Sequence, residues 1–388
     1  MAFITWDRKT RQTASDQVPD EPAANHGLAG RQMNKNSPAS GDWKSPGGEP
    51  VKGPLIESYS RPGAEFSRYE AWLLGTLNVL LINEAEEAAQ EAFDCLNSIE
   101  QRLSKFLPES DVSLLNALAA SRPVTVGEEL LHLIERSRQA WEITGGAFDP
   151  SIGSLMQAWG LVDMEAQSPD ELELARMLEC RGMDLVEISP DTREVRFLRP
   201  GVSIDLGAIG KGYAADQVAA LLQEKGVEKG AMLSGRSTVL TWGLPQDETG
   251  WQVEICHPRD EDETLCRLEM QPGALSSSSA AERFLRSGGK TYGHILDPRS
   301  GRPTETIEGA TIWTRQALLG DVLSTALFIL GRDALGEDGC IEELVRAWTP
   351  VGEEPRASIL LAEKDPGSWG GVGWETFHIG EPGFTARD

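Results

Sequence analysis

The sequence predicts an α+β fold built on a largely antiparallel sheet. Helical and strand patterns are mixed along the chain, several strands fall in hairpin-like pairs, and no regular βαβ period is visible. A regular βαβ alternation would instead have indicated a doubly wound parallel sheet. At 388 residues with 40% hydrophobic content, the chain is long enough to bury a large core.

Residues 1–65 are expected to form an extension outside the folded part. This stretch is rich in Pro, Gly, Ser and charged residues and has little apolar periodicity, which is typical of disordered or loosely attached segments. The pattern changes near Ala71. Residues 66–388 are therefore expected to form a single domain.

The domain begins with AWLLGTLNVLLI (71–82), which predicts a strand pair bent at Gly75 and followed by a long helix. The apolar stripe of that helix is assigned to the core and contains Ala85, Ala89, Ala92, Phe93, Leu96, Ile99 and Leu103. Further helices are expected near 111–120, 128–144, 170–180, 211–225, 317–330 and 338–347. Strands are expected at 194–198, 231–234, 238–242, 251–257, 264–270 and 310–314, with a C-terminal edge hairpin from 357–363 and 374–380.

The charge balance limits the partners of the chain. Asp and Glu number 61 against 36 Lys and Arg, a formal net charge of −25, which opposes binding to nucleic acid or to an anionic membrane. No run approaches the roughly 18 apolar residues of a membrane span. A pyrophosphate ligand would also be repelled, so its site would need a metal ion, a Lys or a helix N-terminus.

The five cysteines are widely spaced and include no CxxC pair, which indicates neither a zinc site nor a disulfide framework. The N-terminal MAFITWDRKTRQTASDQ has no apolar core of a secretory signal and no lipobox-like Cys. The sequence therefore predicts a cytoplasmic protein.

Two glycine-containing segments are candidates for ligand contact. TGGAFDP (144–150) places two glycines at a helix end, before an aromatic residue and a carboxylate held by proline. An ordinary helix end and turn would look the same. DLGAIGKGYAAD (205–216) allows close backbone approach and begins a helix at Lys211, which suits an anion. It has neither Walker A nor GxGxxG spacing, so an ordinary glycine-rich turn is the alternative.

Two later segments carry groups suited to catalysis and metal binding. In HILDPRSGRP (294–303), His294 is expected within an apolar strand, where it is either packed structurally or exchanges a proton with an attacking hydroxyl. In DVLSTALFILG (321–331), Asp321 and Thr325 share one helix face and offer hard oxygen ligands for Mg²⁺. The alternative is that Thr325 bonds to its own helix and Asp321 interacts with the helix dipole.

Taken in order, these segments resemble the ApbE family of FAD:protein FMN transferases, from about Leu73 to Leu330. LGT (74–76) is similar to the family's Met-Gly-Thr. LSKF (103–106), with Ser110 and Asn116, is similar to its LS-x-Y…S-x-x-x-x-x-N stretch. GGAFDP is as the family has it.

The resemblance implies a T-fold-like core with packed helices and a magnesium-dependent transferase that uses FAD as substrate. His294 would assist catalysis, and Mg²⁺ would be held by the Ala208 carbonyl, Asp321 and Thr325. The implied FAD contacts are Leu74, Phe106, Ala147, Phe148, Asp149, Asp205, Lys211 and Ile295.

In the implied reaction, a Thr or Ser hydroxyl of an acceptor flavoprotein attacks the FMN-side phosphorus of FAD, and AMP leaves. Two alternatives remain. The chain could bind FAD after losing transfer, or it could be an FAD pyrophosphatase in which water replaces the acceptor hydroxyl and AMP and FMN are released.

Several positions depart from the family pattern. Phe106 stands where Tyr is usual, and Leu74 stands where Met is usual. In LSGRS (233–237), Arg236 replaces a glycine and either clamps phosphate or blocks the pocket. SSSSAAER (276–283) replaces Thr-Ser-Gly-Asp-Tyr-Glu-Arg, which would affect acceptor recognition or rate. Relatives are often exported, unlike the location expected here.

Overall fold

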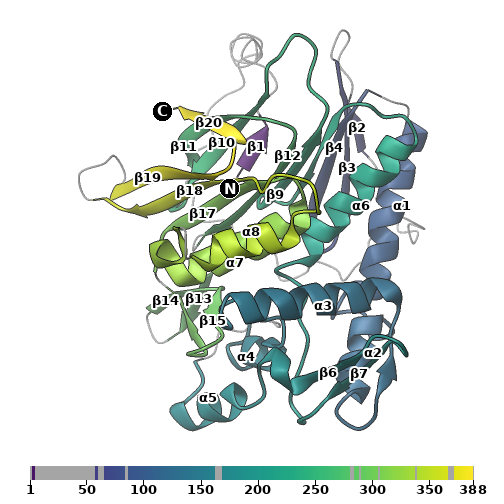
Figure 1. The fold of residues 1–388 in the computed structure, drawn as a ribbon, viewed down its shortest axis with the longest axis vertical. Helices are drawn as coiled ribbons and strands as arrows, with labels where there is room; N and C mark the ends of the chain where they lie inside the picture. The colour runs from purple at the N-terminus through teal and green to yellow at the C-terminus, as the bar shows by residue number, and fades with distance from the viewer. Residues whose placement is uncertain are drawn as a thin grey trace, which may run out of the picture.

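A long antiparallel sheet organises the computed structural model of the protein (Figure 1). Nine of the described strands join in the order β19-β18-β17-β12-β9-β8-β4-β3-β2, and all neighbours are antiparallel. This confirms the α+β class. The structure describes residues 2–4, 57–59, 65–83, 86–161, 168–279, 284–287, 290–304, 306–336, 339–365 and 371–387.

The strands of this sheet are short, and most agree with the predicted positions. β2 and β12 were not predicted. β2 lies in the stretch expected to be disordered or loosely attached, and β12 has the sequence GALSSSS, which lacks the β-branched and aromatic residues typical of strands. The bounds are β2 Glu57–Tyr59, β3 Ser67–Leu73, β4 Thr76–Ile82, β8 Gly230–Ser234, β9 Thr238–Trp242, β12 Gly273–Ser279, β17 Gly309–Thr314, β18 Ala357–Lys364 and β19 Val372–Ile379. β18 and β19 form the predicted C-terminal hairpin at one edge.

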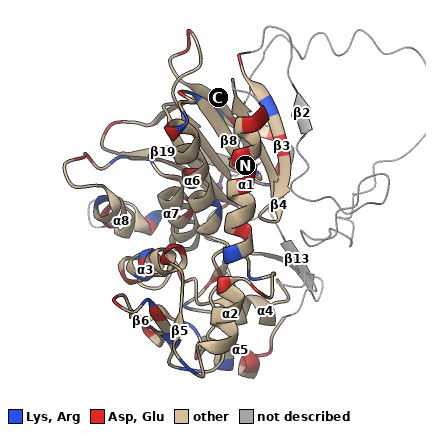
Figure 2. Ribbon diagram, turned by 90° about the vertical axis from the view of Figure 1, so that its right-hand side faces the viewer, with Lys and Arg blue, Asp and Glu red and all other residues tan. Residues whose placement is uncertain are grey.

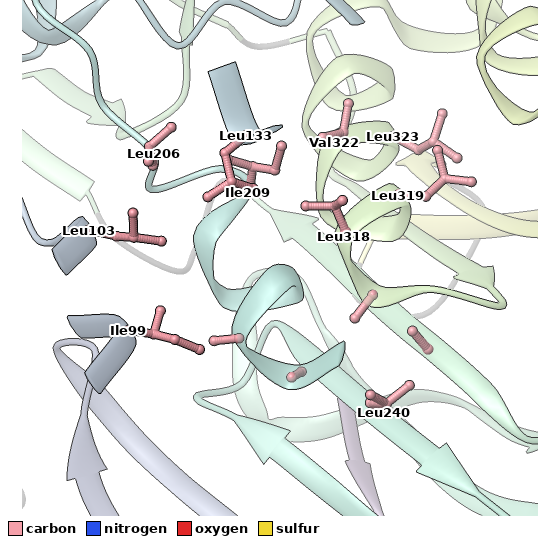
Figure 3. Packing of buried hydrophobic residues seen from close by; sticks show 14 of the residues in the cluster. Ile99, Leu103, Leu133, Leu206, Ile209, Leu240, Leu318, Leu319, Val322 and Leu323 are labelled. Atoms are coloured by element: carbon pink, nitrogen blue, oxygen red, sulfur yellow. The ribbon is translucent and has the colours of Figure 1, made fainter. Parts of the chain in front are cut away.

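Helices cover one face of the sheet (Figure 1). They are α1 Glu86–Leu103, α6 Gly210–Glu224, α7 Ala317–Leu330 and α8 Cys340–Trp348. Figure 3 shows side chains of α1, α7, β9 and the turn before α6 converging in the main core, among them Ile99, Ile209 and Leu323. The predicted apolar stripe of α1 is buried from Ala89 to Leu103, whereas Ala85 lies outside the described residues.

A second sheet packs on the opposite face. Its order is β1-β10-β11-β20, with bounds Ala2–Ile4, Trp251–His257, Asp260–Met270 and Phe384–Arg387. A separate apolar cluster fills the interface, because alternate residues of the main sheet point away from the helices. β1 and β2 both lie within residues 1–65 and pair with β10 and β3.

Shorter elements complete the described chain. The helices are α2 Asp111–Leu118, α3 Glu128–Ile143, α4 Gly153–Ala158 and α5 Glu171–Leu178, with 3₁₀ turns η1 Met183–Leu185 and η2 Gly331–Ala334. The strands are β5 Val124–Thr125, β6 Val186–Ser189, β7 Glu194–Phe197, β13 Phe284–Ser287, β14 Lys290–Gly293, β15 Leu296–Asp297 and β16 Arg302–Pro303. Among these residues, no helix combines the length and apolarity needed to cross a bilayer.

The placement of His294 within a strand is wrong. β14 ends at Gly293 and β15 begins at Leu296, so His294 lies in the bend between two short strands. The apolar neighbours Ile295 and Leu296 gave the segment a strand-like pattern, although only part of it pairs.

The close crossing of α6 and α7 depends on Gly212. A Cβ at this position would lie 2.2 Å from the backbone oxygen of Ala317, too close for any side chain. We expect Gly212→Ala to lower the free energy of unfolding by about 1–3 kcal/mol, because the backbone of α7 must move. Chemical denaturation would measure this loss.

Gly210→Ala is the matched control, because a Cβ there meets nothing within 4 Å and Ala favours a helix over Gly. Equal stability of the Gly212→Ala and Gly210→Ala proteins would contradict the tight crossing.

Candidate functional site

Asp205 fixes the turn that precedes α6. The N–H of Asp205 donates to the carbonyl of Pro150 at 2.7 Å, and Asp205 Oδ1 accepts the N–H of Gly207 at 2.9 Å. The helix then begins at Gly210, with Lys211 in its first turn. Asp205, the half-buried Ala208 and Lys211 therefore occupy one compact turn, tied directly to the end of the GGAFDP segment.

The loop after α1 reaches the same turn. Lys105 forms an ion pair with Asp205, and its Nζ lies 5.1 Å from the ring centroid of Phe106. The Phe106 ring is 62% exposed, which leaves an aromatic face open to a ligand. Asn116 exchanges two hydrogen bonds with the backbone of Ile204, at 2.7 and 2.9 Å.

The GGAFDP segment forms the turn after α3. Gly145 and Gly146 have φ values of 59° and 80°, a conformation that favours glycine. Ala147, Phe148 and Asp149 are buried, so Ala147 and Phe148 present little side-chain surface.

The two carboxylate oxygens of Asp149 differ in their hydrogen bonding. Its Oδ1 accepts hydrogen bonds from the N–H and the hydroxyl of Ser151, at 2.8 and 2.5 Å. Within the described residues its buried Oδ2 has no hydrogen-bond partner. Burial raises the pKa of this carboxyl to about 6. A hydrogen-bond donor on a ligand would pair with Oδ2.

Asp321 on α7 lies at the centre of a polar cluster that it forms with Thr238, Ser276 and the backbone of Gly212. Its Oδ1 accepts hydrogen bonds from the hydroxyls of Thr238 and Ser276 at 2.9 and 2.8 Å, and its Oδ2 accepts the N–H of Gly212 at 2.6 Å. Burial raises the pKa of Asp321, and the charge of Lys211 opposes that rise. A cation here would offset the desolvation of the carboxylate.

The donor set fits magnesium. The described residues contain no cluster of three or more His, Cys, Asp or Glu side chains, but Mg²⁺ needs only one or two carboxylates. A carboxylate has about four lone-pair sites. Three hydrogen bonds to Asp321 leave the fourth, on Oδ2, for a metal.

Thr325 follows Asp321 by one helical turn and is half-buried. Within α7 its hydroxyl makes no hydrogen bond back to the helix, whereas the neighbouring Ser324 hydroxyl bonds to the Asp321 carbonyl at 3.1 Å. The Thr325 oxygen is therefore available to a ligand. The alternative in which Thr325 bonds to its own helix does not hold.

The turn between β8 and β9 borders this cluster. The Ser237 hydroxyl accepts a hydrogen bond from Lys211, and the Ser237 carbonyl accepts the N–H of Ser277 at 2.7 Å. Arg236 is exposed on the turn. The N–H of Gly235 donates to Leu77 at 2.9 Å, which places the β3–β4 turn and its Leu74 alongside.

The segment containing His294 lies beside GGAFDP. A Cβ on Gly146 would lie 3.9 Å from Cγ of Arg299. The Ile295 carbonyl accepts the N–H of Thr304 at 3.0 Å, and Ile295 packs at the edge of the main core, as do Leu74 and Ala208. Glu282 and Arg283 lie outside the described residues.

Asp216 is a structural residue of the site that sequence reasoning missed. It lies on α6, and its two carboxylate oxygens accept the N–H groups of Ala317 and Leu318, at 2.8 and 2.9 Å. These are orphan donors at the start of α7. Burial raises the pKa of Asp216 to about 7, and the nearby Asp321 adds to the rise. The sequence signal that could have identified Asp216 is its place as the last residue of the DLGAIGKGYAAD motif.

The conserved sequence pattern of the ApbE family matches residues 74–337. The chain belongs to the ApbE family. That match contains every segment of the cluster described above and confirms the resemblance stated from the motifs.

Two relatives of this chain carry the name FAD:protein FMN transferase. The FAD:protein FMN transferase of Klebsiella pneumoniae (strain 342) is 31% identical over 275 residues, covering 70% of this chain and 84% of that protein. The FAD:protein FMN transferase of Treponema pallidum (strain Nichols) is 30% identical over 290 residues, covering 69% and 79%.

Solved ApbE structures share the fold. The ApbE protein of Thermotoga maritima superposes with a TM-score of 0.67 at 26% identity, covering 76% of this chain and 94% of that one. The flavin transferase ApbE of Vibrio cholerae gives 0.66 at 22% identity, covering 84% and 98%. The individual roles assigned to FAD, metal and catalytic residues remain predictions.

The hydrogen bonds of Asp216 to the start of α7 predict that the stability contributed by this residue depends on pH. The pKa of Asp216 rises from an ordinary 3.8 to about 7 in the folded chain, so its stabilising contribution is full below about pH 3.8 and is lost as pH rises through about 7. Asp216→Asn keeps one acceptor and does not titrate. The melting temperature of wild type minus that of Asp216→Asn should therefore fall between about pH 5 and about pH 8.

Both proteins would be measured without added metal, so that other titrating groups cancel in the difference. A difference that stays constant over this range, or grows, would be incompatible with a raised pKa at Asp216.

Proposed function

We propose that this ApbE chain is a magnesium-dependent FAD:protein FMN transferase, which moves FMN from FAD to a Thr or Ser hydroxyl of an acceptor flavoprotein and releases AMP. The observation that carries the proposal is the meeting of Asp205, Lys211 and Asp321 around the start of α6. The names of the curated relatives support the substrate and the reaction.

Local positive charge would offset the repulsion between this acidic chain and the pyrophosphate of FAD. The chain as a whole is strongly acidic, and Figure 2 shows acidic residues at the start of α1. At the site, Lys105, Lys211 and Arg236 lie near the N-terminus of α6, whose N–H groups favour an anion. The FAD phosphates are proposed to bind there.

The flavin and adenosine ends of FAD would bind on either side of these cations. The exposed Phe106 ring offers a stacking face, and Leu74 and Ile295 offer apolar edges. The unpartnered Oδ2 of Asp149 accepts a hydrogen bond from a donor on FAD.

Asp321, Thr325 and the Ala208 carbonyl are proposed to hold Mg²⁺. When bound, the ion supplies positive charge to the pyrophosphate and to the departing phosphate of AMP.

The acceptor hydroxyl oxygen forms a bond to the FMN-side phosphorus, and the bond from that phosphorus to the bridging oxygen breaks, so AMP leaves. His294 is proposed to take the proton of the hydroxyl, since imidazole exchanges protons near neutral pH. Lys211 orients the phosphates from its hydrogen bond with Ser237.

The proposal is tested by AMP release from FAD with and without Mg²⁺, in the presence and absence of a peptide carrying a flavinylation-type threonine. Release should require both metal and peptide. Asp321→Ala should lower the rate on the order of a hundredfold or more, because it removes the carboxylate of the metal site.

Asp333→Ala is the matched control, since Asp333 is exposed on the 3₁₀ turn directly after α7. FAD binding without AMP release would identify a binding protein that has lost transfer. AMP release without peptide would identify an FAD pyrophosphatase. AMP release at the same rate without metal and in the Asp321→Ala variant would refute the assigned metal site.

Arg236 is expected to bind phosphate and not to block the site, because its side chain is exposed at the edge of the cluster. Arg236→Ala should weaken FAD binding by about threefold to tenfold, through loss of one charge-assisted contact. Titration of flavin fluorescence would measure the Kd. Tighter binding by the variant would show that Arg236 obstructs the pocket.

A further inference from the structure

The β3–β4 turn holds a leucine in an unfavourable backbone conformation. Leu73 pairs with Thr76, so Leu74 and Gly75 alone form the turn, with φ values of 56° and 68°. Positive φ at both central residues is the pattern of a type I′ turn, which favours Asn-Gly. A branched apolar residue such as Leu is disfavoured there. Such outliers often mark functional positions.

A buried carboxyl lies under this turn. Glu100 of α1 is 7% exposed and shares the helix face that packs into the core. Backbone hydrogen bonds from Leu74 and Gly75 to its carboxyl group act to lower its pKa. Its other oxygen, Oε2, is buried and has no hydrogen-bond partner among the described residues. Burial raises the pKa of Glu100, so this placement is unfavourable for the carboxylate itself.

A second buried residue holds the other side of the turn. The side-chain amide of Asn78 donates to the carbonyls of Leu73 and Thr76, at 2.8 and 3.2 Å. The turn is thus fixed by side chains through its N–H groups and its carbonyls alike. Both interactions are additional to the β3–β4 ladder, whose seven registered pairs join the two strands.

The fixed turn borders the polar cluster. A Cβ on Gly235 would lie 2.6 Å from the Thr76 hydroxyl, so the β3–β4 and β8–β9 turns touch. Two residues farther on, Ser237 bonds to Lys211. The half-buried Leu74 packs on the edge of the main core.

We propose that Glu100 is a positioning residue for FAD: it holds the Leu74–Gly75 turn in the left-handed conformation before FAD binds, so that Leu74 already presents its side chain to the substrate. This inference rests on the proposed function, because it takes Leu74 as an FAD contact. Without the two hydrogen bonds, the turn would relax to conformations that suit Leu, and the apparent Kd would rise in proportion to the lost population.

Glu100→Met tests the proposal, because Met keeps the length of the side chain and removes both acceptors. The Kd and KM for FAD should rise about tenfold, whereas kcat at saturating FAD should change little. The melting temperature should stay equal or rise, since a buried carboxyl is replaced by an apolar group. Glu100→Gln retains one acceptor oxygen and should restore most of the affinity.

Glu87→Met is the matched control, because Glu87 is exposed in the first turn of the same helix. A purely structural role of Glu100 predicts the opposite outcome, a lower melting temperature with an unchanged Kd for FAD. That result would overturn the inference.

A double-mutant cycle with Leu74→Asn separates turn conformation from side-chain contact. Asn adopts the left-handed conformation readily, so the turn should form without Glu100. The effect of Glu100→Met on the Kd should therefore be several-fold smaller in the Leu74→Asn background. An equal effect in both backgrounds would overturn the inference.

Hydrogen exchange of the wild-type protein tests the same idea if Glu100→Met does not fold. The amides of Leu74 and Gly75 should be protected before FAD is added. Free exchange would overturn the inference. A wild-type chain that neither binds FAD nor releases AMP would refute the proposed function as well, whereas normal wild-type binding with an unaffected Glu100→Met variant refutes the positioning role alone.

Discussion

The buried carboxylate of Asp321 is the constraint on which the site depends. It joins α6 through the N–H of Gly212, and it joins β9 and β12 through the hydroxyls of Thr238 and Ser276. An unpaired charge at this depth would be strongly destabilising, so these donors must be present before a metal or substrate binds. Gly212 and Gly320 permit the approach, since a Cβ on Gly320 would lie 2.8 Å from the Ser276 hydroxyl.

Around this centre the fold assembles turns that are far apart in sequence. The loop after α1, the turn after α3, the start of α6 and the β8–β9 turn are joined by short polar contacts, such as those of Lys105 with Asp205 and of Lys211 with Ser237. Each turn is carried by a rigid helix or strand. A ligand at this position would be held by loops that are already joined to one another by these contacts, which reduces the entropy lost on binding.

The sequence predicted most helices, most strands of the main sheet and the family, because those signals are local. Helical spacing located α1, α6 and α7, and four ordered motifs identified ApbE. The serine-rich β12 was missed because its hydroxyls are buried against Asp321 and Ser324, a partnership created only by tertiary packing. Strand propensity cannot detect such a segment.

Glu100 and Asp216 were missed for a related reason. Each is a carboxylate on a helix, where exposure to water is the ordinary expectation. Their backbone partners lie in the turn after β3 and at the start of α7, and neither contact has a local signature. The bend at His294 was mistaken for a strand because short apolar runs do not distinguish a paired segment from an unpaired one.

FMN transfer is tested most directly by the intact mass of an acceptor peptide after incubation with the chain, FAD and Mg²⁺. The peptide should gain the mass of one phosphoester-linked FMN on a single Thr or Ser, and the gain should be absent when that residue is replaced by Ala. An unmodified peptide in a reaction that accumulates AMP and free FMN would contradict transfer and identify water as the acceptor.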